Sequence, residues 1–386
     1  MDKGEIMEFV IFGAKSMALG VYLAFQHLYP NRKICCFLVS KRENNPLQLA
    51  GISVLELSAF ASGLTQEEKD NLEILIATPE NVMDEIEAVL TSYGFNYYVR
   101  QTSLRWARLM GYYYMRNSKY LPLSALPVGY HRADMHIFMA KFVKDKPLTE
   151  YYPVPRWVTP VQVGAALCKE RVADVLDCEG DNISEKNGNY SELTALYWIW
   201  KTYLSGELSG KTSRHVQDKS GNEIGARENE SGGYYGLCHY RRMLELSEDD
   251  VLRLADNDVD VVLPYPMPYE PNIEEHHKRY LSDGDWKALL TALEEIRPDD
   301  AAALPAILKQ QYLYHYNIIL AKKHVLAQYC QWLFPVLERV EQLSEPKGWE
   351  RKDRYIGYMG ETLATLYFML NKDKRNIVYT GCRFLT

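Results

Sequence analysis

The first hundred residues alternate short apolar runs with amphipathic stretches. The runs at 9–12, 34–39, 52–55 and 75–77 are typical of buried strands, and the stretches at 16–28 and about 80–93 are typical of helices. Pro79 would stand at the start of the second helix, where the missing N–H costs nothing. Strands that alternate with helices at this spacing predict a parallel α/β sheet. We therefore expect a Rossmann-like domain over residues 1–125.

The turn after the first strand carries only part of a nucleotide-binding pattern. A dinucleotide fingerprint needs glycines at 13, 15 and 18, but Lys15 and Ala18 stand at two of these positions. The second strand ends in Ser40-Lys41-Arg42, without an acidic residue for a ribose hydroxyl. The turn is similar to that of small Rossmann-like domains before some sugar-modifying bacterial enzymes, which hold a nucleotide sugar or act as docking units. A purely structural glycine turn is the alternative, and we expect no use of NAD in catalysis.

A second α/β region begins near Asp134 with a strand at 135–139, after a basic, tyrosine-rich helical connector at 100–130. Residues 205–233 are polar and rich in glycine, which predicts a long surface loop inserted in this region. Periodic stretches at about 303–321, 323–343 and 360–370 predict helices. We therefore expect a second domain over residues 132–386.

Composition excludes several classes of protein. The net charge of −7 argues against nucleic acid as the main partner, because duplex binding needs a concentrated excess of Lys and Arg. No apolar run approaches the length of about 18 residues that a membrane helix needs. The seven cysteines show no metal-like spacing, which is typical of reduced thiols. We expect a cytoplasmic protein with at most peripheral contact with the inner face of the membrane.

Three dense polar and aromatic segments follow one another in the second region, at 160–164, 181–201 and 234–242. The second segment begins with a polar loop whose side chains either bind sugar hydroxyls or close local turns. Asn189 and Glu192 have the spacing of a capping box. The third segment is an apolar strand that ends at Arg241 and Arg242, where open α/β sheets bind ligands. These two side chains suit a pyrophosphate, unless they form structural ion pairs with nearby carboxylates.

The three segments, in this order, closely resemble a bacterial glycosyltransferase family that has long been catalogued as a domain of unknown function. The family occurs in capsule and O-antigen gene clusters. Later pieces fit as well, at 260–264, 316–317 and 357–363 together with Arg354, so that the resemblance covers about 132–386. It implies a GT-A-like fold and transfer of a sugar from a UDP-sugar to a surface polysaccharide or a lipid-linked glycan. Some members transfer galactofuranose. The N-terminal domain lies outside the resemblance.

The resemblance also implies a set of site residues. The residues expected to bind the donor are Gln162, Gly164, Asn182, Ser184, Asn187, His239, Arg241 and Arg242. An inverting transfer needs one carboxylate as general base near the acceptor hydroxyl. The candidates are Asp181, Asp283 and Glu361, with Asp285 a further possibility; a solvated helix face or a helix cap is the alternative role for the last three.

The sequence bears on metal dependence as well. GT-A enzymes usually place an Asp-x-Asp motif after a central strand, where a divalent ion neutralises the donor pyrophosphate. Here the comparable strand runs into Arg241 and Arg242, so we expect no cofactor and no metal, with arginine supplying the positive charge. Asp256, Asp258 and Asp260 form a rival metal site, but they precede a strand, which favours a helix-end or turn role.

Two other functions remain open at this point. One is a non-catalytic module that binds a nucleotide sugar or a glycan during assembly. The other is a nucleotide-sugar oxidoreductase or epimerase built on the N-terminal domain, which would need nucleotide binding at 13–20.

Overall fold

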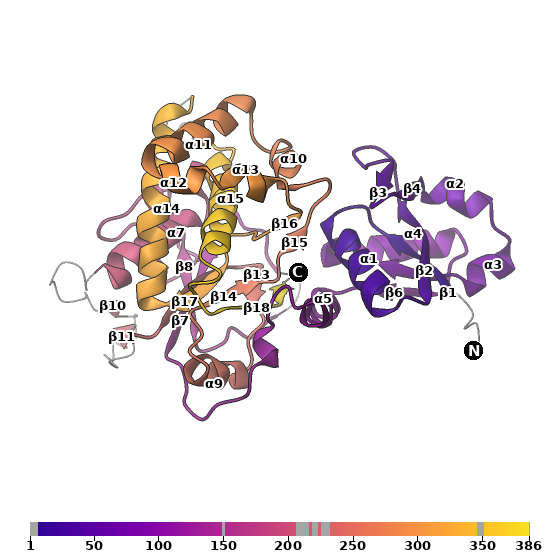
Figure 1. Ribbon diagram of the computed structural model, residues 1–386, viewed down its shortest axis with the longest axis horizontal. Coiled ribbons are helices and arrows are strands. Elements are labelled where there is room, and N and C mark those ends of the chain that lie inside the picture. The colour runs from indigo at the N-terminus through magenta and orange to yellow at the C-terminus, as the bar shows by residue number, and fades with distance from the viewer. Residues whose placement is uncertain are drawn as a thin grey trace.

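The computed structural model describes residues 7–148, 151–205, 216–217, 223–224, 232–345 and 351–385. Each of two large sheets forms the centre of one part of the molecule, and helix α5 (Ser103–Asn117) lies between them (Figure 1). Within the described residues, no helix is both long and apolar enough to span a bilayer. The expected α/β class is confirmed.

The N-terminal sheet has the order β3-β4-β2-β1-β5-β6, and β3 is its one antiparallel strand. Its strands are β1 (Met7–Phe12), β2 (Arg32–Val39), β3 (Gln48–Leu49), β4 (Ile52–Glu56), β5 (Glu73–Ile76) and β6 (Tyr98–Arg100). Its helices are α1 (Ser16–Leu28), α2 (Leu57–Ser62), α3 (Gln66–Asn71) and α4 (Met83–Ser92). The strand order reverses between β1 and β5, and such a switch point is where open α/β sheets bind ligands.

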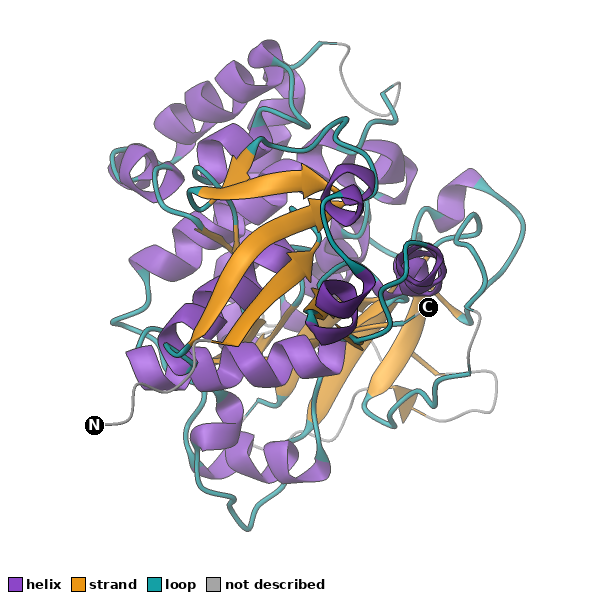
Figure 2. Ribbon diagram, turned by 90° about the vertical axis from the view of Figure 1, so that its right-hand side faces the viewer, coloured by secondary structure: helices purple, strands orange, loops and turns teal. Residues whose placement is uncertain are grey.

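Strand β1 is continuously apolar because both of its faces are buried. Phe9 and Ile11 belong to one core cluster, and Val10 and Phe12 belong to another on the opposite face of the sheet. Figure 2 shows helices on both sides of the sheet. Gly13 then has a φ of +129°, and a Cβ there would lie 2.6 Å from the Ala77 carbonyl oxygen. The close approach of the β1 and β5 ends therefore requires this glycine, whether or not a ligand binds.

The second sheet has the order β18-β14-β17-β12-β7-β8-β9, with β13 and β19 attached beside β12. Its strands are β7 (Met135–Lys141), β8 (Val158–Gln162), β9 (Val175–Leu176), β12 (Tyr234–His239), β13 (Arg242–Leu244), β14 (Val261–Pro264), β17 (Ile319–Lys322), β18 (Ile377–Thr380) and β19 (Cys382–Phe384). Strands β12, β7, β8 and β9 run parallel, so their carboxyl ends meet at one edge.

Helices cover this sheet and form most of the second part (Figure 1). They are α6 (Asn187–Tyr190), α7 (Leu193–Ile199), α9 (Glu248–Asp256), α10 (Ile273–His277), α11 (Asp283–Ile296), α12 (Pro298–Ala301), α13 (Leu304–Leu308), α14 (Lys323–Leu343) and α15 (Tyr355–Leu370). A π-helix at Trp200–Leu204 extends α7. Two short antiparallel pairs are β10 (Val216–Gln217) with β11 (Glu223–Ile224), and β15 (Met267–Pro268) with β16 (Tyr312–Leu313).

The expected elements 9–12, 34–39, 52–55, 16–28 and 323–343 are confirmed, but the helix expected at 303–321 is wrong. Helix α13 ends at Leu308, and the chain then forms β16 and β17. Strand β17 lies between β12 and β14 and pairs with both, so tertiary pairing overrides the helical periodicity. Most of the expected loop at 205–233 lies outside the described residues.

Candidate functional site

A cavity of about 330 Å³ lies where β7, β8 and β12 end. Its walls come from the residues after these strands, from the start of α7 and from α15; they include Asp145, Asn187, Ser191, Glu192, His239, Arg241, Arg242, Tyr316, Arg354 and Glu361. The structure thus brings all three dense segments to one place, the first through Val163, together with the later pieces of the resemblance around Tyr316 and at 354–361. Of the expected site residues, Asn187, His239, Arg241, Arg242 and Glu361 line this cavity.

The arginines of the cavity are held without ion pairs. The Arg242 guanidinium lies 4.1 Å from the centre of the Tyr316 ring and 5.2 Å from that of Phe384. The Nε of Arg241 donates to the Leu385 carbonyl oxygen at 3.3 Å. Arg354 is exposed at the start of α15. Across the described ranges, none of these three guanidinium groups forms an ion pair with a carboxylate, so the structural ion pairs considered above are not observed.

Glu361 is the candidate base that lies in the cavity. Its Oε1 accepts a hydrogen bond from the Tyr316 N–H at 2.9 Å. Burial raises the pKa of Glu361 to about 8, and the nearby Glu192 adds to this rise, while the Tyr316 N–H and Arg242 oppose it. The carboxyl group is therefore mostly protonated at pH 7 and becomes a comparatively strong base once it ionises.

His239 lies next to the same carboxylates. Its Nε2 is 3.8 Å from an oxygen of Glu192, and it has no hydrogen-bond partner among the described residues. Burial lowers the pKa of His239, Glu192 opposes the change, and Arg242 adds to it. The imidazole is therefore neutral at pH 7 and can donate to or accept from a bound ligand.

Two consecutive residues beside the cavity, Tyr316 and Asn317, adopt left-handed backbone conformations, with φ of +68° and +50°. Glu361 holds the first through its N–H, and Glu192 holds the second by accepting from the Asn317 Nδ2 at 2.6 Å. Backbone strain of this kind persists only where surrounding contacts enforce it, and it is common at ligand sites. The two carboxylates therefore also shape the wall of the cavity.

Glu192 does not form the expected capping box. Helix α7 has no side-chain cap bond at Glu192, which instead faces Asn317 and the cavity. The spacing between Asn189 and Glu192 was misleading, because the hydrogen-bond partner of Glu192 is Asn317, 125 positions later. Sequence reasoning also passed over Tyr316 and Arg354 as site residues, although both lie in the matching pieces of the resemblance; that placement was the available signal.

Three expected donor-binding residues lie outside the cavity lining, in a buried network around Asp177. Asp177 accepts from the N–H groups of Gly164 and Ala165 at 2.9 and 3.0 Å. It also accepts from the hydroxyls of Ser184 and Thr194. Asn182 closes its own turn, because its Oδ1 accepts from the Ser184 N–H and its Nδ2 donates to backbone carbonyls.

Gln162 is likewise part of the supporting structure. It is fully buried, its Oε1 accepts from the Val172 N–H at 2.9 Å, and its Nε2 donates to the Glu170 carbonyl oxygen at 2.8 Å. Together with the Asp177 network, these bonds fix the loop between β8 and β9 behind the cavity. Asn187 connects the two regions, since it lines the cavity and its Nδ2 donates to the Ser191 carbonyl oxygen at 2.9 Å.

The other two carboxylates proposed as catalytic residues lie away from the cavity. Asp181 accepts from the Tyr197 hydroxyl at 3.1 Å and pairs with Lys201. Asp283 is exposed in the first turn of α11, and neither side chain is among the residues that line the cavity. Asp285 is buried and forms an ion pair with Arg351, which favours its alternative role as a structural residue.

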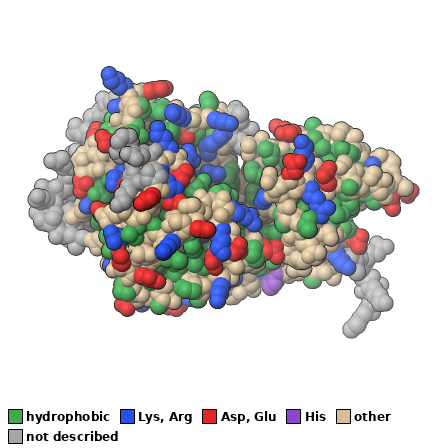
Figure 3. Space-filling view, turned by 90° about the horizontal axis from the view of Figure 1, so that it is seen from above, with side chains coloured by type: hydrophobic (Ala, Val, Ile, Leu, Met, Phe, Trp, Pro, Cys, Tyr) green, Lys and Arg blue, Asp and Glu red, His purple; other side chains and the backbone are tan. Residues whose placement is uncertain are grey.

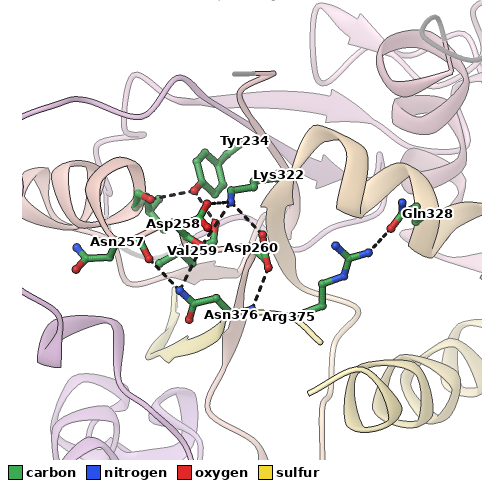
Figure 4. Close-up of polar contacts among 10 residues, drawn as sticks. Tyr234, Asn257, Asp258, Val259, Asp260, Lys322, Gln328, Arg375 and Asn376 are labelled. Carbon is green, nitrogen blue, oxygen red and sulfur yellow. Dashed lines mark hydrogen bonds and ion pairs between the residues drawn. The ribbon is translucent and has the colours of Figure 1, made fainter. Parts of the chain in front are cut away.

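The rival metal site is a lysine-centred cluster (Figure 4). The Lys322 ammonium pairs with both Asp258 and Asp260, at 3.0 Å from the latter. Burial alone would raise the pKa of Asp260, but the Asn376 N–H and Lys322 bring it below its ordinary value. Lys322 ends β17 and Asp260 precedes β14, so this cluster lies at the edge of the sheet opposite to the cavity. The structural role favoured above fits this geometry.

Asp256 has a separate structural role, because it ends α9 and accepts from the backbone N–H of His131 at 3.2 Å. Over the ranges that the structure describes, no group of three or more His, Cys, Asp or Glu side chains is arranged to hold a metal ion.

Comparisons with known proteins found one matching family and a similar solved structure. A family model described as "Domain of unknown function (DUF4422)" matches residues 145–215 and 226–373. Among solved structures, the chain is similar to one described as "WbbM bifunctional glycosyltransferase apo structure", with a TM-score of 0.50 and 22% identity. The match covers 66% of this chain and 45% of that one, so this chain spans less than half of its length. At this identity the likeness shows a shared fold. A comparison with curated proteins found no significant match.

Proposed function

Because the chain belongs to the family described as a domain of unknown function (DUF4422), and shares its fold with a glycosyltransferase, we propose that it is a glycosyltransferase. The donor is a UDP-sugar, and galactofuranose is the first sugar to test. The acceptor is a glycan of a surface polysaccharide, in free or lipid-linked form. We place the reaction in the cytoplasm or at the inner face of the membrane.

One observation carries the proposal: three arginines without carboxylate partners line one cavity beside a buried acid. Arg241, Arg242 and Arg354 are positioned where parallel strands end, the usual place for a nucleotide or phosphate ligand in such sheets. A guanidinium can donate two parallel hydrogen bonds to one phosphate group. A diphosphate has enough oxygen atoms to accept from three guanidinium groups. Three carboxylates, Asp145, Glu192 and Glu361, line the same cavity and suit hydroxyl groups of a sugar.

The residues support an inverting transfer with Glu361 as general base. The acceptor hydroxyl oxygen attacks the anomeric carbon of the donor sugar while the bond from that carbon to the diphosphate oxygen breaks. The diphosphate leaves with the bonding electron pair, and the acceptor proton passes to the Glu361 carboxylate. The arginines stabilise the charge that develops on the leaving group, which is the usual effect of fixed cations at such a site. His239, neutral at pH 7, is suited to a hydrogen bond with a sugar hydroxyl.

The side chains at this edge do not fit the metal site common in GT-A enzymes. β12 ends in Cys238 and His239 and is followed by Tyr240 and two arginines rather than by an Asp-x-Asp motif. The aspartate pair considered above, Asp258 and Asp260, is held by Lys322 at the opposite edge of the sheet. We therefore propose that the arginines neutralise the charge of the donor diphosphate, so that the transfer needs no metal ion.

The test is turnover of UDP-sugars, including UDP-galactofuranose, by the purified chain, followed as UDP release with and without glycan acceptors. Release that rises with acceptor and disappears in Glu361→Gln supports the proposal. Binding of UDP-sugars without turnover under any condition would instead favour a glycan-assembly module. Oxidation or epimerisation of the sugar would favour an enzyme built on the N-terminal part.

A further inference from the structure

A second, larger cavity of about 860 Å³ lies between the N-terminal sheet and the candidate active site. On one side it is lined by the turns after β1, β2 and β5, which is the switch point of the N-terminal sheet. On the other side it is lined by Arg241, Arg242 and Tyr316, which also line the first cavity. The two cavities therefore share one wall, and that wall carries cations. In Figure 3 a notch separates the two parts of the molecule, with Lys and Arg side chains beside it on the larger part.

The N-terminal side adds further positive charge. Lys15 and Lys41 line the cavity, and in the described part of the chain neither forms an ion pair with a carboxylate. The Lys15 ammonium donates to the Asn44 carbonyl oxygen at 2.6 Å, which holds it in place. Burial and the nearby Arg279 lower the pKa of Lys15, so an anion close to it would be favoured electrostatically. The first turn of α1 carries no acidic residue that could occupy this position.

The remaining polar groups of this cavity suit a sugar. Glu43 and Glu85 line it, while Glu80 is already engaged by the Ser103 N–H at 2.6 Å. Carboxylate oxygens accept hydrogen bonds only, so they pair naturally with hydroxyl groups. Apolar side chains such as Ile86 and Val89 complete the wall. The lining thus combines cations for a phosphate with carboxylates and apolar surface for a glycan.

We propose that the cavity between the two parts is the acceptor site, and that the acceptor is a glycan carrying a phosphate group held by Lys15 and Lys41. This inference rests on the proposed function, since a transferase must hold donor and acceptor side by side. Arg241 and Arg242 lie at the boundary between the two ligands. The N-terminal part thereby has a role in catalysis that needs no dinucleotide, because it provides half of the acceptor site.

The experiment measures the binding of two ligands to the full-length chain by titration calorimetry. UDP probes the first cavity, and N-acetylglucosamine 1-phosphate is then titrated into the UDP-saturated chain to probe the second. The sugar phosphate should bind saturably in the presence of UDP. The double variant Lys15→Ala, Lys41→Ala should weaken this binding about tenfold or more, as expected for the loss of two charged contacts. The affinity for UDP should change less than about twofold.

Two further variants keep the test independent of folding. Lys41→Glu changes an exposed side chain, so it should fold normally and still weaken sugar phosphate binding. Lys33→Ala, an exposed lysine of the same sheet outside the cavity, should leave both affinities unchanged.

The outcomes separate this proposal from the proposed function. Absence of saturable sugar phosphate binding, or binding that ignores both lysine variants, overturns the acceptor site. Tighter, lysine-dependent binding of adenosine monophosphate than of the sugar phosphate also overturns it, because the cavity would then be a nucleotide site. If UDP does not bind but the sugar phosphate still binds through the lysines, the result contradicts the proposed UDP-sugar donor. It leaves the assignment of the second cavity as a sugar phosphate site intact.

Discussion

Replacement of Glu361 by Gln tests the chemistry of the candidate site most directly. The pKa of Glu361 is raised from its ordinary 4.5 to about 8, chiefly by burial. A difference of one in pKa corresponds to about 1.36 kcal/mol, so charging this group costs roughly 5 kcal/mol more in the folded protein than in the unfolded chain. The glutamine variant keeps the shape and an acceptor for the Tyr316 N–H but never ionises.

Activity and stability should respond to pH in opposite directions. In the wild type only the ionised base is active, so kcat/KM should rise about tenfold between pH 6 and pH 7 and level off above pH 8. Because the folded pKa is raised, the stability that the neutral group provides is complete below about pH 4.5 and is lost as the pH rises through about 8. The stability of Glu361→Gln should therefore gain on the wild type across that window.

The assay is the initial rate of transfer from pH 6 to pH 9.5 at constant ionic strength, with denaturant unfolding at the same pH values. Glu361→Gln should lose about 10²- to 10⁴-fold in kcat/KM together with the rise with pH. The exposed Glu338→Gln on α14 is the matched control and should follow the wild type. If kcat/KM of Glu361→Gln still rises with pH, another group is the base. If the difference in free energy of unfolding between Glu361→Gln and the wild type does not change with pH, Glu361 is not held in its neutral state.

Four further outcomes follow from the geometry. Arg242→Ala should raise the Kd for UDP about 10- to 100-fold in calorimetry, and Arg242→Lys should recover only part of this because Lys lacks the planar fork; full recovery would contradict a bidentate contact. Ser184→Ala should lower the free energy of unfolding by about 1–3 kcal/mol, because Asp177 loses a buried donor, and should leave turnover per folded molecule near the wild-type value. Asn187→Ala should instead lower turnover, and equal effects of the two variants on activity would argue against this division. Transfer in excess chelator should proceed at the rate seen without it; a loss that manganese restores would move attention to Asp258 and Asp260. NADH should show no saturable binding in calorimetry, whereas tight, saturable binding would reverse that conclusion.

Local patterns in the sequence were enough to predict the class of fold and part of the site. The alternation of apolar runs with amphipathic stretches identified β1, β2, β4 and β5 of the N-terminal sheet and helix α1, but not the short strands β3 and β6. Both faces of the identified strands are buried by helices next to them in the chain. The position of Arg241 and Arg242 directly after an apolar strand indicated that they lie at the tip of β12. Each of these features depends only on residues that lie in the same helix or strand or in the one next to it in the chain.

The tertiary structure decided which other residues join them. Glu192 and Asn317 are bonded across 125 positions, and Asp177 organises three elements through hydrogen bonds that no sequence spacing reveals. Strand β17 replaced a predicted helix because two distant strands pair with it. The wall shared by the two cavities joins Arg241 to the turn that carries Lys15, more than half the chain away. Contacts of this kind depend on how whole elements pack, which the periodicity of a single segment does not encode.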